Sequence, residues 1–289
     1  MTTTGAMSAR PSTYFSTRLS AKRPVRRSFQ AIGQWTTFIG QTLWLLPLTV
    51  RKYPRQTLQA MNRLAWGRGS LIVDGGTISV LVILGLALGA SIAIEAFAIL
   101  NLIGFGALSG IIGGVGTVRE IGPLVAGIAF TAQAGCRMTA EIGAMRISEE
   151  IDAVDALGLR PIPFVVGTRL IGGMAVVIPG YLLTLVVSFS VLHLVIISVY
   201  NQPAGTYNHY LLMFLTSTDL LYSVLKATVF CAAVTLIHCY YGYFTTGGPV
   251  GVGRASGRAV RASLVTIMVL DFTLTVLLWG LQPVFVFKG

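Results

Sequence analysis

The sequence predicts an all-α polytopic membrane protein with about five transmembrane helices, preceded by an amphipathic helix that lies in the membrane interface. Of the 289 residues, 54% are hydrophobic and only 11% are charged, whereas soluble domains average about 25% charged residues. Long apolar runs recur along the chain, and Lys and Arg gather in segments that would lie on one side of a membrane. These observations exclude an ordinary soluble globular protein.

The apolar runs give the positions of the spans, since a transmembrane helix needs about 20 predominantly apolar residues. A run at 118–136 is the weakest, because Arg119, Glu120 and Gln133 interrupt it. The apolar, glycine-rich segment 99–115 is predicted to be an outer-side or re-entrant segment rather than a span. The four clear spans are predicted at residues 76–97, 162–199, 219–244 and 259–286.

The part of the chain before the spans has a different character. Residues 1–27 form a basic tail, and residues 28–70 are predicted to contain an interfacial helix followed by a basic linker. Between Phe29 and Val50, apolar residues recur every three or four positions with polar residues between them. This pattern is typical of a helix that lies along the membrane surface. The membrane domain then covers residues 71–289.

The distribution of positive charge predicts the orientation of the chain. Eleven of the 21 Lys and Arg residues lie between Arg10 and Arg68, and most of the others fall between spans two and three or between spans four and five. With five spans, these segments share one side, which the positive-inside rule makes the cytoplasm. We therefore expect a plasma-membrane protein with a cytoplasmic N-terminus and an outer C-terminus. The net charge of +11 is matched by anionic lipid headgroups and requires no nucleic-acid partner.

A polar island at residues 140–158 contains half of the ten acidic residues. Ser148 is predicted to cap a short helix, with Glu149, Glu150 and Asp152 in the first turn, where the helix dipole favours negative charge. Gly158 would end the helix. A stripe of Ile147, Ile151 and Val154 would form its apolar edge. The residues alone leave two interpretations open, a solvated connector and a helix that docks into a cytoplasmic partner.

Motifs in and around this island resemble those of the MlaE/YrbE permease family. They are Arg-Glu-Ile-Gly-Pro at 119–123, Ala-Glu-Ile-Gly-Ala-Met-Arg-Ile-Ser-Glu-Glu-Ile-Asp-Ala at 140–153 and Gly-Gly-Pro-Val-Gly-Val-Gly-Arg-Ala-Ser at 247–256. The chain departs from the family pattern at Gln133 and at Cys136, where an Arg is expected. The basic tail and the Ile-Ser-Glu-Glu run look most like the YrbE branch of actinobacterial (mycobacterial-type) Mce systems.

The resemblance implies an MlaE-like permease fold over 71–289 and a helix near 140–158 that couples to an ATPase. The chain would then be a permease subunit of an ATP-driven Mce transporter that imports hydrophobic lipids such as fatty acids, mycolic-type lipids or sterols. Its implied partners are an ABC ATPase dimer, a second YrbE-type permease chain, membrane lipids, and MCE-domain proteins docked outside on the aromatic segment 200–218. The implied ATPase-coupling residues are Glu141, Met145, Arg146, Ile147, Ser148, Glu149, Glu150, Ile151 and Asp152.

The chain is expected to be a transport subunit and not an enzyme. It contains no Gly-x-x-x-x-Gly-Lys-Ser/Thr motif, the loop that holds nucleotide phosphates. ATP and Mg²⁺ would therefore be used by the partner ATPase, and we assign this chain no catalytic residue and no cofactor. The three Cys and three His residues lack the spacing of a metal site, so no metal is expected either.

Ionisable residues inside the spans are the remaining candidates for function, because burying them in a bilayer costs about 2.5–3.5 kcal/mol each. Glu95, Arg119 and Glu120 are predicted to form a polar rim at the outer mouth of a lipid cavity, or merely to cap helices. Lys226 and Asp271 lie at depths that differ by roughly 5 Å and are predicted to pair. Two rival functions remain: a proton-coupled secondary lipid carrier that uses Asp271 and Glu120, and a membrane scaffold that transports nothing.

Overall fold

The computed structural model describes residues 23–67 and 75–280. Within these ranges every regular element is helical, and one isolated bridge joins Gly67 to Gly75. Five helical segments are long and apolar enough to cross a membrane. The prediction of an all-α polytopic membrane protein with five spans is therefore confirmed. The predicted basic tail, residues 1–27, lies mostly outside the described residues.

The chain divides into two compact units, residues 1–41 and residues 42–289. Helix α1 (Arg23–Trp44) supplies the described part of the first unit. The single interfacial helix expected over 29–50 is interrupted at Leu45. A second helix, α2 (Leu46–Lys52), begins at the next residue. Pro47 explains the break, because proline clashes with a preceding helical turn but fits the first turn of a new helix.

Helix α3 (Pro54–Trp66) follows α2 and begins in the same way, with Pro54 in its first turn. Both short helices pack on the third spanning segment. Thr49 of α2 donates a hydrogen bond to the Pro163 carbonyl (3.3 Å). Helix α3 approaches so closely that a Cβ on Gly172 would lie 3.1 Å from the backbone nitrogen of Met61.

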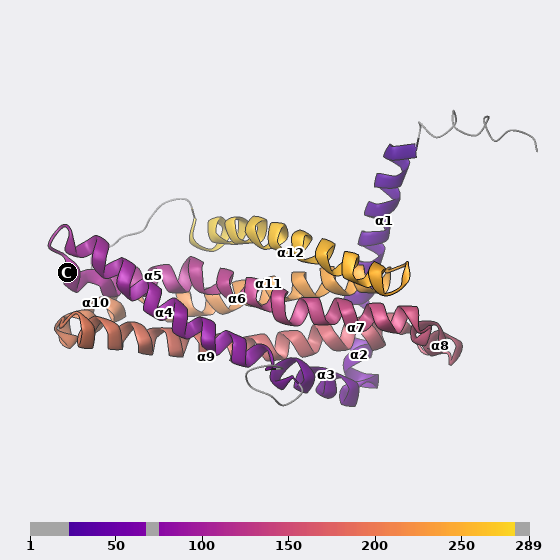
Figure 1. The fold of residues 1–289 in the computed structure, drawn as a ribbon, viewed down its shortest axis with the longest axis horizontal. Coiled ribbons are helices and arrows are strands. Elements are labelled where there is room, and N and C mark those ends of the chain that lie inside the picture. The colour runs from indigo at the N-terminus through magenta and orange to yellow at the C-terminus, as the bar shows by residue number, and fades with distance from the viewer. Residues whose placement is uncertain (1–22, 68–74, 281–289) are drawn as a thin grey trace, which may run out of the picture. The chain divides into compact units, whose positions relative to one another are not determined.

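The five spanning segments form the second unit together with α2, α3 and two short connecting helices (Figure 1). The second and third spans are continuous helical segments that contain π-helical turns. A π-helical turn holds about one residue more than an α-helical turn. The first span is α4 (Thr77–Asn101). The second is α5 (Ser109–Gly116), η3 (Thr117–Ile121), α6 (Gly122–Phe130), η4 (Thr131–Gly135) and α7 (Cys136–Ile147). The third is η5 (Pro163–Gly167), α9 (Thr168–Leu194) and η6 (Val195–Val199). The last two are α11 (Ser217–Tyr243) and α12 (Gly248–Trp279).

The second span begins earlier than predicted. In the segment 99–115, residues 99–101 end α4 and residues 102–108 form the connection, which contains the 3₁₀ turn η2 (Gly106–Leu108). From Ser109 the chain belongs to the long helical segment. The expectation of an outer or re-entrant segment was therefore wrong from Ser109 onward. Its glycines serve packing: a Cβ on Gly110 would lie 2.8 Å from the Tyr207 carbonyl oxygen, so only glycine allows this approach.

The last span also begins earlier, at Gly248 rather than near residue 259. Gly247 has a left-handed backbone (φ +90°), which turns the chain, and Pro249 lies in the first turn of α12. The loop expected at 247–256 is therefore helical from its second residue. The predicted end of the span, residues 281–286, lies outside the described residues.

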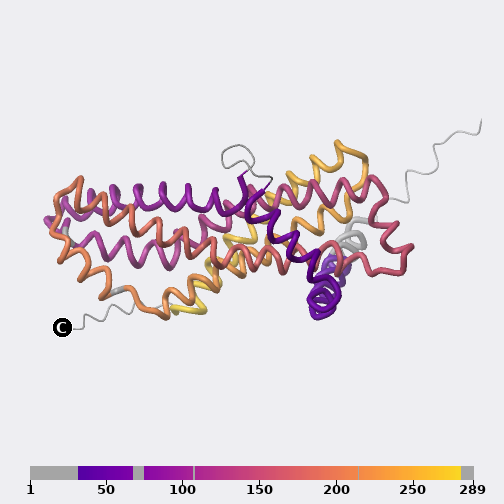
Figure 2. Tube along the Cα trace, turned by 90° about the horizontal axis from the view of Figure 1, so that it is seen from below, coloured from indigo at the N-terminus to yellow at the C-terminus, as the bar shows by residue number. Residues whose placement is uncertain are grey.

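Within the second unit, the long helices run side by side in both views (Figures 1 and 2). Helix α4 packs along α9, and α11 packs along α12, α7 and α9. Helix α8 (Glu150–Ala156) lies at one end of this bundle, and α10 (Ala204–Phe214) lies at the other (Figure 1). The polar island and the aromatic segment are thus at opposite ends.

Candidate functional site

The polar island at the α8 end consists of two helices separated by a sharp turn. Helix α7 ends at Ile147, and α8 begins at Glu150. The prediction that Ser148 caps α8 was wrong, because its hydroxyl donates back to the Ala144 carbonyl (3.0 Å) and closes α7. Glu149 precedes α8 in a left-handed conformation (φ 59°), which costs a non-glycine residue roughly 1–2 kcal/mol. As predicted, Gly158 ends the helix, with φ +75°.

The predicted apolar edge of this helix does not form one surface. Ile151 is only 1% exposed and fixes α8 to the rest of the bundle, whereas Ile147 is 41% exposed. Val154 is half-buried. The most exposed large apolar side chain near α8 is instead that of Leu157, at 77% exposure. Of the predicted stripe, Ile151 therefore packs inside the protein, whereas Ile147 is exposed to a possible partner.

The acidic side chains of α8 face outward. Glu149, Glu150, Asp152 and Asp155 are all exposed. Asp152 forms an ion pair with Arg146 of α7 (2.6 Å), which bridges the turn between the two helices. The Ser148 hydroxyl also lies 3.0 Å from the Glu150 carboxylate. The result is a small acidic surface that is held in place by the buried Ile151 and by these polar contacts.

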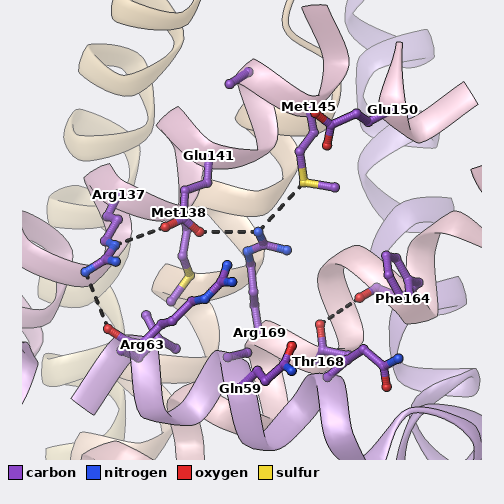
Figure 3. A pocket seen from close by; sticks show the side chains of 14 residues that line it. Gln59, Arg63, Arg137, Met138, Glu141, Met145, Glu150, Phe164, Thr168 and Arg169 are labelled. Carbon is purple, nitrogen blue, oxygen red and sulfur yellow. Dashed lines mark hydrogen bonds and ion pairs between the residues drawn. The ribbon is translucent and has the colours of Figure 1, made fainter. Parts of the chain in front are cut away.

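Three of the predicted coupling residues, Glu141, Met145 and Glu150, lie on the wall of a cavity, and through Glu150 this cavity adjoins the acidic surface (Figure 3). Arg137 binds one oxygen of the Glu141 carboxylate (3.0 Å), and Arg169 of α9 binds the other (3.3 Å). The sulfur of Met145 lies 3.9 Å from the same Arg169 guanidinium. The carboxylate of Glu141 therefore joins α7 to α9.

A second group of charged residues lies inside the bundle, around the π-helical turn η3. A π-helical turn disturbs the regular i to i+4 bonding of a helix. Two carbonyls of this turn accept from α11: that of Val118 from the Ser223 hydroxyl (2.6 Å), and that of Arg119 from the Lys226 ammonium (2.9 Å). The wide turn thereby docks onto α11 and places Glu120 beside Lys226.

Lys226 is the centre of this group, and its side chain is fully buried. Its three N–H bonds are directed to the Arg119 carbonyl, to Glu120 Oε2 (3.1 Å) and to Thr275 Oγ1 (2.6 Å). Asp271 Oδ1 lies 2.8 Å from the same ammonium and forms an ion pair with it. The structure thus brings together Lys226 and Asp271, the pair predicted from their similar depths in the membrane. It adds Glu120 as a second carboxylate.

Beside this group, Arg119 forms an ion pair with Asp219 (3.2 Å). Trp279 donates its indole N–H to the same carboxylate (2.6 Å), and the Arg119 guanidinium lies 5.6 Å from the Trp279 ring centre. Sequence reasoning missed Asp219, Trp279 and Thr275. A signal for Asp219 existed in Thr216-x-x-Asp219, a helix start in which the Thr216 hydroxyl accepts from the Asp219 amide.

The polar rim predicted from three residues is only partly assembled. Arg119 and Glu120 belong to the group around Lys226, but Glu95 is exposed on α4 and has no hydrogen bond or ion pair with a described residue. The aromatic surface predicted at 200–218 is also reduced. Tyr207 is 1% exposed and packs in the core with Leu88 and Leu192, and the side chain of Phe214 lies outside the described residues.

Comparison with known proteins shows what the sequence as a whole is similar to. Residues 69–277 match the model of the family described as Permease MlaE. A "Probable ABC transporter permease protein" of Rickettsia typhi is 32% identical over 161 residues, which cover 56% of this chain and 62% of that protein. TRIGALACTOSYLDIACYLGLYCEROL 1 of the Arabidopsis thaliana chloroplast is 31% identical over 54% of this chain and 45% of its own length.

A relative in Haemophilus influenzae matches over a longer part of the chain. It is named the intermembrane phospholipid transport system permease protein MlaE, and it is 28% identical over 210 residues, covering 71% of this chain and 80% of its own length. The family match spans all the described charged groups and more than half of the sequence. The chain therefore belongs to the MlaE permease family.

Proposed function

We propose that this chain is the membrane-spanning permease subunit of an ATP-driven lipid transporter of the Mce type, which imports hydrophobic lipids across the plasma membrane. The Haemophilus relative, a permease of a phospholipid transport system, supports a lipid substrate. A separate ATPase dimer would bind ATP and Mg²⁺ and supply the energy. The observation that carries the proposal is the acidic surface of α8 at one end of the bundle, which is exposed yet firmly held.

The second spanning segment offers a route from this surface to the charged group in the bundle. It runs without a break from Ser109 to Ile147. Arg146, at its α8 end, pairs with Asp152 of α8, and Glu120, farther along the same segment, binds Lys226. A movement of α8 on ATP binding would therefore reach the Glu120–Lys226 contact through one helical segment. Such coupling requires an element with two arrangements that both sites influence.

Helix α12 supports the proposal of a second permease chain. Only 11% of its most apolar stretch is buried within the chain, the lowest share among the five spans. The large apolar side chains exposed along this stretch are Val265, Met268, Val269, Phe272 and Leu277. In a transporter built from two permease chains, these faces would meet or would line the space between the chains. The MCE-domain proteins would dock at the α10 end.

The test is to co-express the chain with its ATPase and measure ATP hydrolysis by the purified complex. Glu149→Lys combined with Glu150→Lys should release the ATPase and abolish ATP-dependent lipid uptake. The matched control, Glu149→Gln with Glu150→Gln, removes charge without reversing it and should retain part of the activity. Uptake that continues without ATP but stops when the proton gradient collapses would overturn the proposal.

One observation favours the rival proton-coupled carrier. Two carboxylates, Glu120 and Asp271, share the single ammonium of Lys226, so one of them could take up a proton without losing an essential ion pair. The response of uptake to the proton gradient separates the two functions directly. A scaffold that transports nothing would tolerate Glu120→Gln with no change in any uptake assay.

A further inference from the structure

A cavity of about 440 Å³ lies where α3 meets α7 and the start of the third span (Figure 3). This volume falls in the ~300–1,000 Å³ range of small-molecule sites. Three arginines line it, Arg63, Arg137 and Arg169, together with the acids Glu141 and Glu150. The charged lining therefore has one net positive charge.

The arginines retain unused capacity to donate hydrogen bonds. A guanidinium carries five N–H donors. Arg137 uses two atoms, Nε on Glu141 and Nη1 on the Arg63 carbonyl. Arg169 uses Nη1 on the Val165 carbonyl and Nη2 on Glu141 and the Met145 sulfur, which leaves its Nε free. The side chain of Arg63 has no hydrogen bond or ion pair with any described residue. The carboxylate of Glu141 positions two guanidinium groups beside a third that is free, an arrangement suited to a planar or tetrahedral oxyanion.

The same cavity has an apolar part. Leu64, Met138, Met145 and Phe164 line it. A site of this composition fits a ligand with an anionic head and an apolar body, and it fits a small inorganic anion less well. Basic pockets between transmembrane helices on the cytoplasmic side are suited to lipid headgroups.

Helix α3 indicates that the cavity lies at the depth of the headgroups. Its face toward the bundle buries Leu64 and Ala65, whereas Leu58 and Trp66 are 54% and 62% exposed. Exposed tryptophan next to basic residues is typical of the membrane–water interface. Helix α8 starts at the cavity, where Glu150 lies, and is at the end of the bundle (Figure 1). A lipid in the leaflet on this side would reach the cavity along α3.

We propose that this cavity binds the phosphate headgroup of one anionic phospholipid from the leaflet on the basic-loop side, and that the bound lipid fastens α3 to α7 and α9. The phosphate would contact Arg63 and the free N–H groups of Arg137 and Arg169, and the upper acyl chain would lie against the partly exposed Met145 and Phe164. This lipid is a resident ligand, and its binding does not depend on the transport function proposed above.

The test uses the full-length protein purified in detergent, together with any partner chains that co-purify. Equal amounts of phosphatidylglycerol and phosphatidylcholine are added, and native mass spectrometry measures the lipid retained. We expect one phosphatidylglycerol to be retained in preference to phosphatidylcholine. Arg63→Gln should weaken its binding about fivefold, the factor that corresponds to the ~1 kcal/mol contributed by one basic residue near an anionic surface.

Arg55→Gln is the matched control, because Arg55 is an exposed arginine on the same helix that does not line the cavity. It should bind phosphatidylglycerol as the unchanged protein does. Gel filtration and thermal unfolding verify that both variants are folded. In the unchanged protein and in Arg55→Gln, phosphatidylglycerol should also raise the unfolding temperature, because a ligand that binds only the native state stabilises it.

Several results would overturn the proposal. Equal loss of lipid in Arg63→Gln and Arg55→Gln would indicate diffuse surface charge rather than a site. Displacement of the lipid by millimolar glycerol 3-phosphate or inorganic phosphate would indicate a pocket for soluble anions. Retention of phosphatidylglycerol by Arg63→Gln at the level of the unchanged protein would show that the cavity does not hold it. A photocrosslink from a probe at Gln59 to a partner subunit, and not to lipid, would assign the cavity to a protein side chain.

Discussion

Lys226 Nζ lies 3.1 Å from Glu120 Oε2, although the two residues are 106 positions apart in the sequence. The same ammonium lies 2.8 Å from Asp271, so it holds two carboxylates of two different spans. We predict that Lys226→Met destabilises the protein by about 3–5 kcal/mol, the cost of leaving the largely buried carboxylate of Asp271 without its partner. Asp271→Asn should cost much less when it is introduced into Lys226→Met than when it is introduced alone.

Thermal unfolding of the purified variants in detergent gives this coupling as a double-mutant cycle. The control cycle combines Lys226→Met with Glu95→Gln, because Glu95 is exposed and contacts none of these groups. Its two effects should add. Additive effects of Lys226→Met and Asp271→Asn would contradict the ion pair as a source of stability.

A second prediction concerns the contact between α4 and α9. A Cβ on Gly89 would lie 2.3 Å from the carbonyl oxygen of Ser188, a backbone atom that cannot move aside. Gly89→Ala should therefore lower stability by at least about 1–3 kcal/mol through overpacking. Gly116→Ala is the control, because nothing lies within 4 Å of its Cβ. It should be neutral or stabilising by up to ~1 kcal/mol, and equal melting temperatures for the two variants would refute the close contact.

A third prediction separates anchoring from docking at α8. Ile151 is buried and Ile147 is exposed, so their truncations should have different effects. Ile151→Ala should destabilise the α8 region by about 2–5 kcal/mol, visible as faster hydrogen exchange in residues 147–158. Ile147→Ala should leave that exchange unchanged but weaken binding of the proposed ATPase. If Ile151→Ala leaves exchange unchanged, α8 is not anchored as described.

A fourth prediction tests the exposed face of α12. Phe272→Cys, in a variant without the native cysteines, should crosslink to a neighbouring permease chain when membranes are treated with a short bifunctional maleimide. Leu221→Cys on α11 has similar exposure in the isolated chain, 67% against 71%, and should remain uncrosslinked. The mobility of the product on a denaturing gel is the measurement. Crosslinking at Leu221 instead would place the second chain on α11.

The sequence was sufficient to predict the class of the fold and the number of spans, because apolar length alone determines what can cross a bilayer. It was also sufficient to place Lys226 and Asp271 at similar depths, since rise along a helix is linear. It misplaced Glu120, and the reason is physical. Gly110, Gly113 and Gly114 were interpreted as interruptions, whereas they allow α5 to pack closely. The span therefore starts at Ser109, and Glu120 lies eleven residues inside it.

The parts that could not be predicted depend on contacts between distant segments. Nothing local indicates that the carbonyls of Val118 and Arg119 would accept from α11, or that Ile151 would be the one buried residue of its stripe. The break at Ser148 has the same origin: a capping serine closes either the helix before it or the helix after it, and only the packing of α8 decides between them.

The second span contains two π-helical turns, η3 and η4, whose position along the helix can shift. If a wide turn moves along the segment, the residues it passes turn by about 100° about the helix axis, because each residue of an α-helix advances by that angle. Both ends of the segment can meanwhile remain at the same depth. Arg119 and Glu120 lie within η3, so these are the side chains that such a shift would redirect. A small displacement at the α8 end of the segment could thus change the direction in which the Arg119 and Glu120 side chains point.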